Sequence, residues 1–165
     1  MDITFYLELF QNAAQKIDKG VLARKQLEIA TGLYVDSVFL KLYKKSWASP
    51  SPDPLTAQSR IFFSAWICDS AIAEQKLLYN IHALKLRQLK GYAIASRKFA
   101  ESFRGRFSEF ENRWLNVSLN YGPLTLMQGW VKADPEKMQE EIVGLAKNFL
   151  ELEPLIDQTL AEFKV

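Results

Sequence analysis

Cysteine and histidine are each present only once in the 165-residue sequence, as Cys68 and His82. One cysteine excludes a disulfide within the chain, and nothing in the cysteine content indicates an oxidising compartment. The usual metal sites need several histidine, cysteine or carboxylate side chains that converge. Cys68 lies in an apolar run, which predicts a small buried side chain and not a reactive thiol. We therefore expect no metal and no cofactor.

Recognisable catalytic motifs are also missing. The sequence has no phosphate-binding loop, no dinucleotide-binding glycine pattern and no Gly-x-Ser-x-Gly element. Cys68 and His82 are too far apart, about 21 Å on a single helix, to act as nucleophile and base. No catalytic residue is assigned, and an enzyme is the function class that the sequence supports least.

Long apolar runs are absent as well. The most apolar stretch, IFFSAWICDSAIA at 61–73, contains Asp69 and is too short to span a bilayer. The N-terminus lacks the basic region, apolar run and small-residue cleavage site of a secretory signal. These absences predict a soluble, cytoplasmic protein without stable membrane insertion.

Helical periodicity is the main pattern that is present. Apolar residues recur at steps of three and four, for example at Ile3, Leu7, Phe10, Ala14 and Ile17. No alternating strand pattern of convincing length is found. The sequence therefore predicts an all-α fold, a single-domain helical bundle of four to five long helices over residues 1–165.

Proline and glycine mark the expected boundaries. The prolines of SPSPDP at 49–54 predict a connector. Gly91 is the expected hinge between two long helices, because one helix over 56–121 would be roughly 100 Å long. A loop is expected over 120–134. The last helix is expected to begin at 135 and to kink at Pro154, because its apolar stripe crosses the proline.

Charge is unevenly distributed. Residues 85–107 carry seven Lys or Arg and one Glu, whereas residues 108–165 carry ten acidic and five basic residues. On one helix, Lys90, Arg97 and Arg104 align at seven-residue spacing, and Arg87 and Lys98 extend the basic side. The aromatic residues of this segment fall in a separate sector of the helix, and the basic residues line up beyond one edge of it, so base stacking is not expected. The basic side is interpreted as a solvated or protein-facing ridge, a phosphate-binding surface, or a contact with anionic membrane.

Lys76, five intervening residues and His82 are distantly similar to the motif of HEPN proteins, helical-bundle RNases that carry Arg, four to six residues and His. Here lysine replaces the arginine, and Leu77 replaces the usual polar residue that follows it. The resemblance covers seven residues. It implies at most a ribonuclease variant of a nucleic-acid-binding function.

Two functions follow from these patterns. The main prediction is a non-catalytic helical protein-interaction or regulatory module that binds another protein or a second copy of itself, as an adaptor, a regulator, an accessory factor or an immunity-type partner. Aromatic residues make up 13% of the chain, and Trp47, Trp114 and Trp130 are candidate interface anchors. The alternative is a basic bundle that binds nucleic acid through the residues of 85–107.

Overall fold

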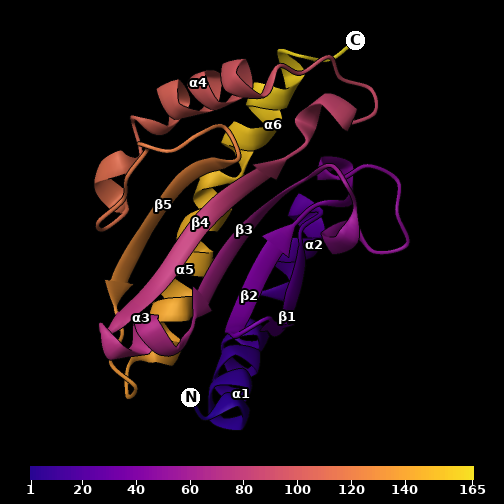
Figure 1. Ribbon diagram of the computed structural model, residues 1–165. Helices are drawn as coiled ribbons and strands as arrows, with labels where there is room; N and C mark the ends of the chain where they lie inside the picture. Colours follow the sequence, from indigo (N-terminus) through magenta and orange to yellow (C-terminus); the bar gives the residue numbers. More distant parts are fainter.

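Five β-strands form one antiparallel sheet in the computed structural model, which describes residues 1–165 (Figure 1). Each strand pairs with the next along the chain, in the order β1-β2-β3-β4-β5. The prediction of an all-α helical bundle is therefore wrong, and the protein combines a sheet with helices. The strands are β1 (Glu28–Tyr34), β2 (Ser37–Tyr43), β3 (Arg60–Ile67), β4 (Lys76–Leu84) and β5 (Thr125–Lys132).

The helices gather on one side of the sheet. Helix α1 contacts β1 and β2, α5 contacts α1 and β3, and α4 contacts β5 and α6. In Figure 1 the gold helices α5 and α6 lie behind the strands, whose other face is turned to the viewer. The sheet is thus covered on one face and open on the other. The helices are α1 (Ile3–Gln15), α2 (Lys19–Lys25), α3 (Asp69–Ala73), α4 (Ser96–Phe107), α5 (Met138–Leu152) and α6 (Pro154–Ala161).

Apolar residues in the strands also occur at helical spacing, which explains why the sequence was interpreted as all-α. In β2, Val38, Leu40 and Leu42 are fully buried, but Val38 and Leu42 are also four residues apart. In the central strand β3, Phe62 and Phe63 are both buried although they point to opposite faces. A strand that is apolar on both faces shows no alternation, so periodicity alone does not separate it from a buried helix.

The predicted boundaries fall differently from expectation. Strand β5 occupies residues 125–132, inside the expected loop at 120–134. Gly91 has a φ angle of +91° and lies in the irregular segment between β4 and α4, so it does not join two helices. Residues 49–53 run irregularly between β2 and β3, and Asp53 accepts a hydrogen bond from the Leu55 N–H group at 3.0 Å.

The two ends of the chain are helical, as the periodicity indicated. Asp2 caps α1 by accepting a hydrogen bond from the Phe5 N–H group at 3.0 Å. At the other end only Glu153 separates α5 from α6, and Pro154 is the first residue of α6. Apolar residues of both C-terminal helices enter the core, among them Phe149 and Ile156.

A group of charges around the buried Lys44 ties α6 to the end of β2. The ammonium of Lys44 lies 2.7 Å from Asp157 and 2.9 Å from Glu153, and only 9% of its side chain is exposed. The Trp47 indole N–H donates to the same Asp157 carboxylate at 2.8 Å. Burial, the largest influence, lowers the pKa of Lys44, but the two carboxylates outweigh it and raise the pKa above its usual value. Lys44 is therefore positively charged, and the carboxylates of Glu153 and Asp157 stabilise its charge.

Candidate binding face

An apolar row crosses the open face of the sheet. The strand register places Phe39 opposite Trp66, Trp66 opposite Leu78, and Leu78 opposite Trp130. Residues directly opposite one another in neighbouring strands point to the same face. All four side chains are partly exposed. The row continues to Gly32 in β1, because the Phe39 ring covers this glycine and would lie 3.1 Å from a Cβ atom placed there.

A polar row runs beside the apolar row. Lys41 is opposite Ser64, Ser64 is opposite Asn80, and Asn80 is opposite Gln128. Asn80 is 2% exposed, and its amide donates to Gln128 Oε1 at 3.2 Å. Its Oδ1 atom is buried and accepts no hydrogen bond. The open face therefore contains an unsatisfied acceptor. A buried oxygen without a hydrogen-bond donor lowers the free energy of unfolding by roughly 1–3 kcal/mol.

His82 continues the polar region on β4. The Asn80 amide lies 2.9 Å from its Nε2 atom, and its Nδ1 atom lies 3.2 Å from the Leu124 carbonyl oxygen. The Nδ1–H group therefore donates to Leu124, and Nε2 accepts from Asn80. Burial lowers the pKa of His82, and the charges of Lys41 and Arg60 lower it further, against the effect of the Leu124 carbonyl. The imidazole is neutral at neutral pH.

Cations lie over the aromatic rings of this face. The Lys41 ammonium is 4.4 Å from the centre of the Phe39 ring and 4.6 Å from that of Phe62. The Lys76 ammonium is 4.7 Å from the Trp130 ring and also pairs with Glu74 at 3.3 Å. Such contacts combine an apolar surface with positive charge. Three cations of the face have no carboxylate within ion-pair distance: Lys41, Arg60 and Lys132.

The polar groups of this face are not arranged as a nucleophile with its base. Burial, followed by the charge of Arg60, lowers the pKa of Lys41, but no hydrogen bond joins Lys41 to Ser64. An activated serine would require that contact. No group of three or more His, Cys, Asp or Glu side chains is placed to hold a metal ion.

The three predicted tryptophan anchors occupy different environments. Trp47 is fully buried and Trp114 is 3% exposed, and both belong to the hydrophobic core. Trp130 alone is partly exposed, at the end of the apolar row. Of the three predicted anchors, only Trp130 therefore belongs to the open face. Its neighbours in the row were not predicted, because their strands were interpreted as helices.

The predicted basic ridge is divided between a loop and a helix. Arg87 and Lys90 precede α4, whereas Arg97 and Lys98 lie in its first turn; all four are exposed and form no ion pair. Arg104 has a different environment, because its guanidinium donates to the carbonyl oxygens of 121, 122, 125 and 126 at 2.9–3.1 Å. Arg104 thus fastens the loop before β5 and does not align with Lys90 on one helix.

The placement of Lys76 and His82 on β4 removes the helical context of the HEPN resemblance. Six residues along a strand span about 20 Å, compared with about 9 Å along a helix. Their separation therefore does not reproduce the helical spacing of the motif.

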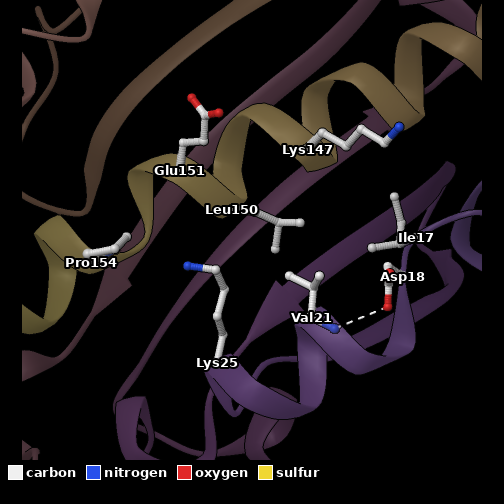
Figure 2. Close-up of a pocket in the computed structure, with 8 residues that line it drawn as sticks. All are labelled: Ile17, Asp18, Val21, Lys25, Lys147, Leu150, Glu151 and Pro154. Atoms are coloured by element: carbon white, nitrogen blue, oxygen red, sulfur yellow. Dashed lines mark hydrogen bonds between the residues drawn. The ribbon is translucent and has the colours of Figure 1, made fainter.

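A separate recess of about 400 Å³ lies between α2 and the junction of α5 with α6 (Figure 2). Its charged groups have structural partners: Asp18 caps α2, Lys25 pairs with Glu153 at 3.2 Å, and Glu151 pairs with Arg113 at 3.4 Å. Only Lys147 on its rim is unpaired. The recess therefore has fewer charged side chains available to a ligand than the open face has. It is lined by Ile17, Asp18, Val21, Lys25, Lys147, Leu150, Glu151 and Pro154.

Comparisons with models of protein families, with curated proteins and with solved structures find no match for this chain. None of its helices combines the length and apolar character required to cross a bilayer.

Proposed function

We propose that the protein is a non-catalytic binding module that holds an acidic, apolar-containing segment of another protein on the open face of its sheet. The apolar row from Phe39 to Trp130 carries this proposal. It joins four strands into one surface, and all four of its side chains are partly exposed. Large aromatic side chains at an accessible surface are typical of protein interfaces.

The charges around the row favour an acidic partner. Lys41 borders the row, with its ammonium 4.4 Å from the Phe39 ring, and Lys132 is exposed at the end of β5. Arg60 lies farther along β3, over the Phe62 ring. None of the three has a carboxylate partner. Carboxylates of a bound segment would neutralise these groups while its apolar residues cover Trp66 and Leu78.

Selection from a random peptide library on the immobilised protein tests this proposal. Enriched peptides should combine aliphatic or aromatic residues with Asp or Glu, and should bind with falling affinity as salt is added. Lys41→Glu and Trp130→Ala should weaken binding of an enriched peptide by about tenfold or more. Lys147→Glu is the matched control, because it makes the same charge change at an exposed position on α5.

Two results would count against the proposal. Enrichment of basic peptides would contradict the charge argument. Binding that the variants of the open face leave unchanged would place the interaction elsewhere. Circular dichroism of each variant distinguishes lost binding from lost folding.

A nucleic-acid-binding function is the second candidate, favoured by the four exposed and unpaired cations at Arg87, Lys90, Arg97 and Lys98. Phosphate contacts need only such charges, and they release counterions, so affinity falls steeply with salt. Fluorescence anisotropy with single-stranded RNA, hairpin RNA and duplex DNA measures this. Changing the four cations to Gln should abolish such binding, whereas Lys41→Glu should reduce it less. Arg104 is excluded from this variant because of its contacts with the loop before β5.

A further inference from the structure

Strand β1 has an unpaired edge. None of the backbone groups of residues 28–34 forms a hydrogen bond outside the β1–β2 ladder. The opposite edge of the sheet is protected, because Ser118 exchanges two backbone hydrogen bonds with Gln128 at 2.7 and 3.1 Å. The Asn116 amide also donates to the Trp130 carbonyl oxygen. Only one edge of the sheet is therefore available for another strand.

The features that usually protect such an edge are absent from β1. Apart from Glu28 at its first position, β1 contains no charged residue and no proline, and its pairing with β2 shows no bulge. Lysines, prolines and bulges are the common means by which proteins prevent pairing at an edge strand. Seven uninterrupted residues are long enough to pair with a further strand.

Apolar side chains are exposed where β1 turns into β2. Leu33 is 50% exposed, Tyr34 69% and Val35 89%. Val35 also has a φ angle of +55°, in a region that a β-branched residue rarely adopts and that glycine or asparagine would occupy at lower cost. A strained and exposed valine beside an open edge is consistent with a contact made in an assembly.

We infer that two copies of the chain pair through β1 as antiparallel strands related by a two-fold axis at Thr31. This register uses all seven residues of the strand, and the sequence of β1 is complementary to itself in this orientation. Ile29 lies opposite Leu33 of the partner subunit, which matches two apolar side chains. Ala30 lies opposite the partner's Gly32, which matches two small residues.

The remaining pair brings Glu28 next to the partner's Tyr34, whose phenol can donate to a carboxylate. The pairing joins two sheets of five strands into one sheet of ten, with both open faces on the same side. Because the sequence of β1 is complementary to itself about Thr31, a second copy of the chain is the partner that fits this edge best. The inference does not depend on what the open face binds.

Light scattering and sedimentation over a range of concentrations measure the association. The wild type should have twice the chain mass of 19.0 kDa. Leu33→Asp should weaken the dimer by about tenfold or more. Leu124→Asp is the control, because Leu124 is 51% exposed and lies away from β1, and this variant should remain dimeric.

A second edge variant keeps the test valid if Leu33→Asp folds poorly. Ala30→Glu places a carboxylate opposite Lys41 within the monomer, where it is tolerated. In the dimer it places two carboxylates at diagonal positions across the two-fold axis, about 7–8 Å apart, where they repel. It should dissociate the dimer and leave the melting temperature of the monomer unchanged.

Disulfide formation tests the register. In a Cys68→Ser background, Thr31→Cys should give a disulfide-linked dimer on mild oxidation, because the axis places the two residues opposite one another. Thr4→Cys, exposed on α1, should not. A monomer up to concentrations of hundreds of micromolar, or a dimer that neither edge variant weakens, would overturn the inference.

Discussion

The Tyr79 phenol occupies the space that a side chain at residue 129 would need. The two residues are opposite one another in β4 and β5, and the Tyr79 hydroxyl donates to the Leu115 carbonyl oxygen at 2.8 Å. A Cβ atom at 129 would also lie 2.8 Å from the Asn116 carbonyl oxygen. Gly129→Ala should therefore displace Tyr79 and lower the free energy of unfolding by about 1–3 kcal/mol, measured by urea denaturation.

Gly105→Ala is the matched control for that prediction. Gly105 lies inside α4, and a Cβ atom there meets no other atom within 4 Å. Alanine is a better helix former than glycine, so this variant should raise the free energy of unfolding by roughly 0.5–1 kcal/mol. Equal effects of the two substitutions would contradict the assigned role of Gly129.

Arg104 should contribute to stability, whereas its neighbour Arg97 should not. The Arg104 guanidinium donates four hydrogen bonds to backbone oxygens between 121 and 126, and Arg97 is exposed without an ion pair. Arg104→Gln should lower the free energy of unfolding by about 1.5–3 kcal/mol. Arg97→Gln should change it by less than about 0.5 kcal/mol. Thermal and urea unfolding of both variants measures the difference, and a stable Arg104→Gln protein would remove this residue's role in holding the loop.

Lys44 should be far more important for folding than Lys25, although both contact Glu153. Lys44 is buried between Glu153 and Asp157, whereas 32% of the Lys25 side chain is exposed. Lys44→Met leaves buried carboxylate charge without its main partner and should cost about 3–5 kcal/mol. Lys25→Met should cost less than about 1 kcal/mol, because solvent screens that pair. Similar losses in the two variants would contradict the arrangement.

The sequence predicts the helices at the ends of the chain better than the sheet between them. Helix α1 begins after Asp2, and the apolar stripe that crosses Pro154 corresponds to α5 and α6. These helices have a polar side, so their periodicity of 3.6 residues is visible. Strands β3 and β4 are buried in the middle of the sheet, and most of their residues are apolar or enclosed. Their pattern is shared by a buried helix, and only the short length of each run favours a strand.

The open face could be predicted only after the strands were assigned. Phe39, Trp66 and Trp130 are 27 and 64 residues apart along the chain, and the strand register alone brings them into one row. In 37–43, the alternation of Val38, Leu40 and Leu42 with Phe39 and Lys41 was the available signal for a strand with two different faces. The role of Arg104 could not be predicted, because its acceptors are backbone oxygens of a loop.

Protonation of His82 should destabilise the fold in mildly acidic solution. Burial and the charges of Lys41 and Arg60 lower the pKa of His82 below 6.5, so the unfolded chain binds the proton more readily than the folded protein. The stabilising contribution is present above the pKa of the unfolded state and is lost as the pH falls below it. The wild type should therefore lose more stability than His82→Gln between about pH 7 and about pH 5, as followed by thermal unfolding. Glutamine keeps a polar group beside Asn80 but does not titrate, so parallel pH profiles for the two proteins would show that His82 has no such effect.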